Sequence, residues 1–196
     1  MPELAEVEFF RRRWWEAAAN QTVRSAEANP RSRVYREAVN AVALAKLFPG
    51  AKLMASAAAG KQMMFTFKLG QKCRSANRQP AGKPRAHYLW LGLHLGMSGE
   101  LRVEQPDYAP QKHDALILRF KQSVLVFNDP RQFGRVRATP TGLRERPHWV
   151  EPLPPGVLAR QFTPQKVKQI LQRHARAPLK AVLLNQCYFS GLGNWM

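Results

Sequence analysis

The segment YLWLGLHL at residues 88–95 gives the clearest secondary-structure signal in the chain. Leucine occupies every second position, and because side chains alternate between the two faces of a strand, all of these leucines point to one face. His94 lies between the last two leucines and therefore projects from the opposite face. The segment predicts a β-strand with one buried face and one face available to polar side chains.

Other strand-like segments lie on both sides of this one. In residues 61–67, Met63, Phe65 and Phe67 share one face, and short apolar segments follow at residues 115–120, 123–127 and 135–138. Several short strands of this kind favour a two-layer β-sandwich or flattened barrel.

A helical pattern precedes the strands. Apolar residues recur at steps of three and four, which predicts an amphipathic helix of about four turns. These residues are Leu4, Val7, Phe10, Trp14 and Ala17. The predicted fold class is therefore α+β, with an N-terminal helix and a β-sandwich in residues 1–139.

A proline-rich stretch at residues 140–160 is typical of a linker, and a helical part follows in residues 161–196. Thr163 is a predicted N-cap with Pro164 at the first helical position, opening a helix to about His174. A second helix is expected from Pro178 to about Gln186, followed by a glycine turn at residues 191–194 that leads into a further helix.

The composition is strongly basic. Lys and Arg number 31 against 13 Asp and Glu, for a net charge of +18. Such a positive field favours a polyanionic partner, with nucleic acid ahead of an anionic membrane. The sequence has no apolar run of 18 residues and no secretory signal pattern, so we expect a cytoplasmic protein. Cys73 and Cys187 form neither a disulfide framework nor a four-ligand zinc site, and we expect reduced thiols.

The opening MPELAEVE, residues 1–8, combines an amine with nearby carboxylates. Removal of Met1 would leave Pro2 as a secondary amine, and an α-amino group has a pKa near ~8, well below that of lysine. Such an amine can attack an aldehyde-type sugar carbon and give an iminium directly. The alternative is an ordinary helix start, in which proline and first-turn glutamates suit the helix dipole.

Five segments occur together and in a defined order. They are PELAEVE at 2–8, Gly60-Lys61, HLGMSG at 94–99, NDPRQFG at 128–134 and residues 186–194. Together they resemble the formamidopyrimidine-DNA glycosylase family, bacterial enzymes that remove oxidised purines from DNA. The resemblance covers nearly the whole chain, and it implies an N-terminal catalytic β-sandwich followed by a helix–two-turn–helix module.

The resemblance implies roles for the amino-terminal residues. Pro2 would be the nucleophile that attacks the sugar C1′ and forms a Schiff base, and Glu3 the general acid that protonates the deoxyribose ring oxygen. Glu6 would orient the terminus or its water, or be only a first-turn carboxylate. Lys61 would lie beside the lesion phosphate and assist β-elimination, the alternative being a solvent-facing strand lysine.

The resemblance also implies a set of DNA contacts. His94 and His113 would contact the DNA, although each is otherwise a candidate core histidine. Met97 would wedge into the space left by an extruded base, although a core methionine is the ordinary interpretation. Arg131 would reach the orphaned opposite base, and Phe133 would stack on its neighbour.

Asn194 would help bind a phosphate at a helix N-terminus, a role compatible with a structural N-cap. The chain also departs from the family pattern: Ala5 replaces a proline, Gln132 stands where a second arginine is common, and the basic segment 70–85 has no assigned role. Family members continue into a further helix and a zinc-binding or zinc-less hairpin carrying an arginine, so we expect a truncated form. We expect no metal and no cofactor in this chain, with zinc a candidate only for a full-length form.

Three functions follow from the sequence. The first is a bifunctional DNA glycosylase and abasic-site lyase, monomeric and nucleoid-associated, acting on 8-oxoguanine and formamidopyrimidines in double-stranded DNA. The second is a catalytically impaired remnant that binds damaged DNA. The third is a general basic module that binds RNA or DNA without preference for damage.

Overall fold

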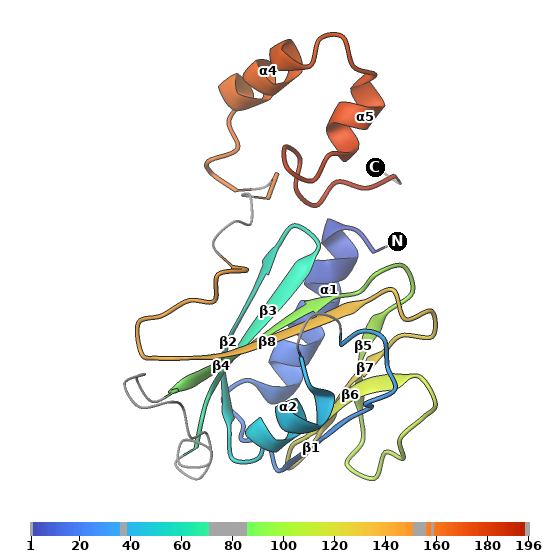
Figure 1. The fold of residues 1–196 in the computed structure, drawn as a ribbon, viewed down its shortest axis with the longest axis vertical. Helices are drawn as coiled ribbons and strands as arrows, with labels where there is room; N and C mark the ends of the chain where they lie inside the picture. The colour runs from blue at the N-terminus through green and yellow to red at the C-terminus, as the bar shows by residue number, and fades with distance from the viewer. Residues whose placement is uncertain (1, 36–38, 71–85, 151–155, 158, 195–196) are drawn as a thin grey trace.

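A computed structural model describes residues 2–35, 39–70, 86–150, 156–157 and 159–194. It contains two four-stranded antiparallel sheets and a separate pair of helices (Figure 1). One sheet has the order β1-β6-β7-β5 and the other the order β2-β3-β4-β8. The elements are α1 (Leu4–Ala18), β1 (Ser25–Ala28), α2 (Ala41–Leu47), β2 (Lys52–Ala59), β3 (Gln62–Lys68), β4 (Tyr88–His94), β5 (Glu100–Glu104), β6 (Asp114–Arg119), β7 (Val124–Asn128), β8 (Arg135–Thr141), α4 (Pro164–Arg173) and α5 (Leu179–Leu184). The predicted α+β class and two-layer arrangement are confirmed.

Helix α1 joins the two sheets at one side of the sandwich. It contacts β5 of one sheet and both β2 and β3 of the other. Trp14, which is fully buried, packs on Phe65 with ring centroids 5.2 Å apart, and its indole Nε1 donates to the Arg102 carbonyl at 3.0 Å. A large apolar ring with a satisfied polar edge fixes the helix firmly, so the start of α1 has a defined position.

Strand β4 has the two faces that its sequence predicts. Leu93 is opposite Met63 of β3 and Val136 of β8, and all three side chains are fully buried. One residue further along the register, His94 is opposite Gln62 and Arg135. The leucine face therefore forms the core, and the opposite face of this sheet presents a row of polar and cationic side chains.

Lys61 does not begin a strand, contrary to the sequence prediction. Gly60 and Lys61 form the two-residue turn of the β2–β3 hairpin, and β3 begins at Gln62. Gly60 has φ +57°, the left-handed conformation that such tight turns require and that glycine adopts without steric cost. The turn brings Lys61 to the tip of the hairpin.

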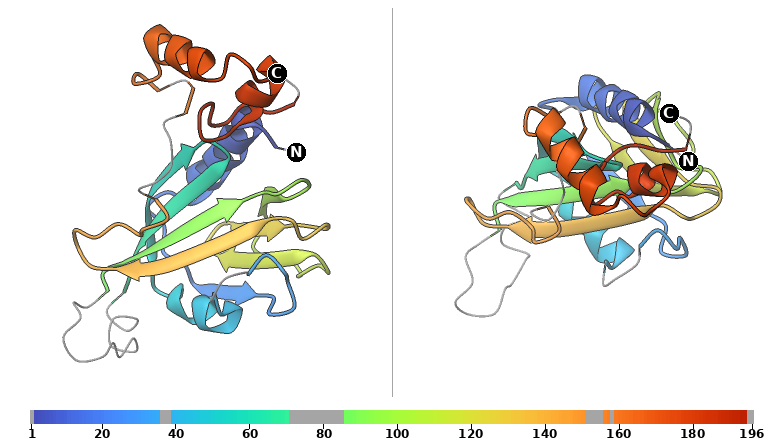
Figure 2. Two further views of the ribbon diagram at one scale, coloured as in Figure 1. Left: turned by 45° about the horizontal axis from the view of Figure 1, so that its top comes forward. Right: turned by 90° about the horizontal axis from the view of Figure 1, so that it is seen from above.

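The helical part lies beyond the β2–β3 hairpin and the beginning of α1 (Figures 1 and 2). Thr163 caps α4 as predicted, its Oγ1 accepting from Lys166 N at 3.3 Å, and α5 begins directly after Pro178. Ile170, Val182 and Phe189 form a small core separate from that of the sandwich. Strand β8 extends to Thr141, two residues into the range predicted as a linker; the domain boundaries themselves stay a prediction.

The basic segment 70–85, including Cys73, falls almost wholly outside the described residues, as does the continuation after Asn194. Cys187 is an exposed free thiol. No helix in the described part of the chain is long and apolar enough to span a membrane.

Candidate functional site

The amino end is held by the first turn of α1. Glu3 is the N-cap residue, and its backbone N–H donates to Glu6 Oε2 at 2.9 Å in a reciprocal capping box. Glu6 is thus a first-turn capping carboxylate, and the same contact fixes the backbone next to Pro2. Both interpretations of Glu6 from the sequence are compatible with this geometry.

Glu3 is buried, with only 6% of its surface exposed, although it is the third residue of the chain. The cause is the turn after α5: a β-carbon on Gly193 would lie 2.0 Å from Glu3 Oε1, so only glycine permits this approach. Gly60 makes a similar approach to Ser190, where a β-carbon would lie 2.1 Å from Oγ. The turn at residues 190–193 therefore packs against both the amino end and the tip of the β2–β3 hairpin.

Lys61 belongs to the same cluster. Burial lowers the pKa of the Lys61 ammonium, and the nearby Glu3 carboxylate opposes that shift. The structure therefore brings together Pro2, Glu3, Lys61 and the turn that ends at Asn194. Asn194 itself is exposed, and its role in phosphate binding stays a prediction.

Gln186 holds the turn at residues 190–193 in place through its side-chain amide, a role that was not predicted from the sequence. Its Nε2 donates to the carbonyls of Leu184 (3.0 Å) and Leu192 (2.8 Å), and its Oε1 accepts from Gly191 N at 3.2 Å. One side chain thus ties the end of α5 to the glycines beyond it. The signal was present, since Gln186 opens the last of the five segments, but its partners are visible only in the fold.

A second cluster is formed by two loops that pack against each other, residues 95–99 after β4 and residues 129–134 after β7. Gly96, at φ +64°, approaches the other loop so closely that a β-carbon would lie 2.4 Å from the Phe133 carbonyl carbon. Asp129 joins the loops: its Oδ2 accepts from Gly134 N at 2.7 Å and its Oδ1 from Ser98 Oγ at 3.2 Å. Asp129 is 1% exposed and was not predicted as a site residue. It fixes the positions of both loops.

These two loops carry the predicted wedge. Met97 is 47% exposed and Phe133 is 50% exposed, so the core-methionine interpretation of Met97 is wrong. The Arg131 guanidinium carbon lies 5.1 Å from the centre of the Phe133 ring, a cation–π distance. Met97 and Phe133 are therefore exposed apolar side chains on loops that are fixed to each other, and the wedge role of Met97 stays a prediction.

His94 lies between the two clusters. The Gly96 N–H donates to His94 Nδ1 at 3.0 Å, so the neutral ring carries its proton on Nε2. Burial, followed by the charges of Arg135, Lys61 and Arg137, lowers the pKa of His94. His94 is thus a neutral donor at pH 7, in a field that attracts anions.

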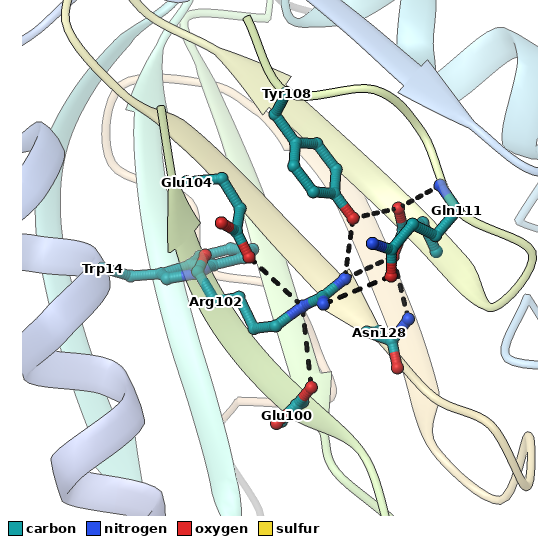
Figure 3. Close-up of polar contacts among 8 residues, drawn as sticks. Trp14, Glu100, Arg102, Glu104, Tyr108, Gln111 and Asn128 are labelled. Carbon is teal, nitrogen blue, oxygen red and sulfur yellow. Dashed lines mark hydrogen bonds and ion pairs between the residues drawn. The ribbon is translucent and has the colours of Figure 1, made fainter. Parts of the chain in front are cut away.

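His113 is half-buried and directly precedes Asp114. An ionic network that includes Arg102 and Tyr108 anchors this loop (Figure 3). Asp114 accepts from Arg102 Nη2 (2.9 Å), Tyr108 Oη (2.8 Å) and Gln111 N (2.7 Å). Burial and the Asp114 carboxylate raise the pKa of Tyr108 to about 12, which keeps the phenol protonated as a donor. The network holds the loop, and the His113 carbonyl accepts from Asp129 N at 3.0 Å, which ties it to the wedge loops.

A groove of about 490 Å³ runs beside His113. Its lining residues are Asn29, Pro30, Arg31, Lys112, His113 and Gln132. Among the described residues, no three His, Cys, Asp or Glu side chains are grouped so as to hold a metal ion.

Comparison with known proteins gives a consistent family. A model of the formamidopyrimidine-DNA glycosylase N-terminal domain matches residues 1–136. Formamidopyrimidine-DNA glycosylases of Parafrankia sp. (strain EAN1pec) and Synechocystis sp. are each 32% identical, over 212 and 202 residues. Both alignments cover 99% of this chain, and 63% and 64% of the relatives.

The solved structures agree. Lactococcus lactis Fpg in complex with abasic-site DNA superimposes with a TM-score of 0.74 at 25% identity, covering 98% of this chain and 64% of that protein. The complex of the same enzyme with Fapy-dG DNA gives the same TM-score. The chain thus spans just under two thirds of the length of these relatives. From the matched domain and the aligned relatives we conclude that this chain belongs to the formamidopyrimidine-DNA glycosylase family.

Proposed function

We propose that the chain is a DNA glycosylase and abasic-site lyase that excises oxidised purines from double-stranded DNA through its amino-terminal proline. The observation that carries this proposal is the position of Pro2 next to the buried Glu3, with Lys61 and the turn at 190–193 packed around them. A helix start alone requires no buried carboxylate and no second segment closing over it. A covalent catalytic site requires both, because the reacting groups must be oriented and shielded from water.

The chemistry follows from the groups present. Once Met1 is removed, the Pro2 nitrogen bonds to the sugar C1′ while the bond from C1′ to the damaged base breaks and its electron pair leaves with the base. The proton that the Pro2 nitrogen loses goes to the departing base. Glu3 then protonates the ring oxygen as the sugar opens, which leaves an iminium on Pro2. Loss of a C2′ proton and of the 3′ phosphate completes β-elimination, and Lys61 stabilises the departing phosphate. A general acid of this kind contributes about 10²–10⁴-fold in rate.

The second cluster serves base extrusion in this proposal. Extruding a base costs a few kcal/mol, and the vacated space must be filled. Met97 and Phe133 offer exposed apolar side chains on loops fixed by Asp129, and Arg131 is held beside Phe133. The complexes of Lactococcus lactis Fpg with abasic-site and Fapy-dG DNA support damaged duplex DNA as the partner.

Borohydride trapping tests the proposal. Protein with a free Pro2, verified by mass spectrometry, is mixed with a duplex containing one abasic site and then reduced. We expect a stable protein–DNA adduct, and strand cleavage when borohydride is left out. Tight and selective binding of abasic DNA without an adduct would instead support the damaged-DNA-binding remnant, and equal binding of intact duplex would support the general basic module.

A further inference from the structure

A basic pocket of about 240 Å³ lies on the outer face of the β3-β4-β8 sheet, beside the wedge loops. Its lining residues are Gln62, Gly92, His94, Phe133, Arg135 and Arg137. Gly92 lets Trp149 and Gln62 pack closely at the floor of the pocket, since a β-carbon there would lie 2.8 Å from the Trp149 ring and 2.9 Å from Gln62 Nε2. The family resemblance assigns a role only to His94 and Phe133 in this set.

The pocket has the charge of an anion site. Its lining includes two guanidinium groups and no carboxylate. Arg137 is half-buried and has no ion pair within the part of the chain that the structure describes. The lowered pKa of His94 reports the same field, because Arg135 and Arg137 both contribute to it. A bound anion would relieve this repulsion.

The spacing of the cations follows the register of the sheet. His94 and Arg135 are direct cross-strand partners, and Arg137 is opposite Gly92, two residues along β8. Two residues of a strand span about 7 Å, which is comparable to the separation of consecutive phosphates in a nucleic acid strand. Strand β8 is the edge strand of this sheet as described, and Arg135 and Arg137 are partly exposed on it.

We propose that Arg135 and Arg137 bind consecutive phosphodiesters of the lesion-bearing DNA strand, extending the contacts of Lys61 and His94 onto β8. This inference rests on the proposed function and adds a binding subsite to it. We assign the backbone as the ligand because the lining offers two guanidinium groups and no carboxylate, and because Trp149 is buried against Gly92 and adds no ring face for stacking. Phe133 forms one wall of this pocket. The preceding residue, Gln132, lines the separate groove at His113. In this proposal that groove is left for the complementary DNA strand.

Salt dependence of binding to an abasic-site duplex provides the first test. Each phosphate contact contributes about 0.9 to the slope of log K against log salt concentration. We expect Arg137→Gln to lower the slope by about one contact, and Arg137→Lys to restore it. Arg24→Gln removes an exposed arginine at the start of β1, on the other sheet, and should leave the slope unchanged. Equal melting temperatures confirm that the variants fold.

Neutral methylphosphonates placed one at a time along the lesion strand identify the partner phosphate. At one of these positions the methylphosphonate should weaken DNA binding by the unchanged protein. The same methylphosphonate should not weaken DNA binding by the Arg137→Gln variant any further. An unchanged slope, or the same methylphosphonate penalty in both proteins, would overturn the inference. A changed preference for a neighbouring base at constant slope would also overturn it and assign the pocket to a base. If the unchanged protein shows no preference for abasic DNA and no trapping, the proposed function itself fails. If it shows both, and the slope or methylphosphonate result goes against Arg137, only the subsite is refuted.

Discussion

Replacing Gly193 by alanine should damage catalysis far more than folding. The new β-carbon would lie 2.0 Å from Glu3 Oε1, whereas ordinary contact begins at 3.4 Å, so the atoms must separate by about 1.4 Å. A displacement of about 1 Å in a catalytic constellation can cost about 10²-fold in rate. We therefore expect Gly193→Ala to lower kcat/KM by about 100-fold, equivalent to about 2.7 kcal/mol.

The stability of the same variant should change little. The atoms that the β-carbon meets belong to the end of the flexible Glu3 side chain, which can move aside. Replacing glycine also restricts the unfolded chain, which raises the free energy of unfolding by about 0.4–1 kcal/mol and offsets the cost of moving Glu3. The melting temperature should therefore stay within about 2–4 °C of the unchanged protein.

The assay is single-turnover cleavage of an abasic-site duplex, followed together with thermal unfolding. Gly156→Ala is the matched control, because a β-carbon there meets no atom within 4 Å. We expect the control to keep full activity. Wild-type cleavage by Gly193→Ala would refute the argument that contact with the 190–193 turn positions Glu3 for catalysis.

Three further predictions concern the second cluster and His94 beside it. Asp129→Ala leaves the buried Gly134 N–H without its acceptor, so we expect a loss of about 1.5–3 kcal/mol in denaturant unfolding, with Asp129→Asn intermediate; an unchanged midpoint would contradict this. Phe133→Ala should leave the melting temperature unchanged, because the ring is half-exposed, and should weaken binding of lesion duplex by about 10-fold, the value of one base-stacking contact; equal loss on intact duplex would argue against insertion. Because the pKa of His94 is lowered in the free protein, binding of a phosphate to its protonated form requires His94 to take up a proton from solvent. DNA affinity should therefore rise as the pH falls toward the lowered pKa of His94. Folding stability should decrease as the pH falls below the ordinary His pKa of 6.5, since the unfolded chain then binds the proton more readily than the folded one. His94→Gln should flatten the affinity profile, and a steep profile in that variant would assign the proton to another group.

Strongly periodic segments were predictable from the sequence, and weakly periodic ones were not. Helix α1 and strands β3, β4, β6 and β7 have clear apolar spacing and lie close to their predicted positions. Strand β2 was missed because its end is rich in alanine and has no alternating pattern; it is a strand because β3 pairs with it along its length. Strand β5 was missed because three of its five residues are charged.

The candidate site was predictable where function follows from local residue types. Pro2, Glu3, Lys61 and the wedge residues Met97 and Phe133 were proposed from short segments, and their roles stay predictions. The roles of Asp129, Gln186 and Gly193 were not predicted, because each depends on contacts made elsewhere in the fold. The position of Lys61 in a turn was not predictable, since a glycine signals a hairpin only between two strand-like segments and β2 has no strand pattern.

Location of the covalent bond in the borohydride adduct tests the central claim most directly. Proteolysis and tandem mass spectrometry of the trapped complex should place the reduced sugar on the nitrogen of Pro2, in a peptide that lacks Met1. Lys61 is the informative competitor, because its lowered pKa makes it the lysine in this site best able to act as a nucleophile. An adduct on Lys61, or one formed by protein that keeps Met1, would contradict the proline mechanism.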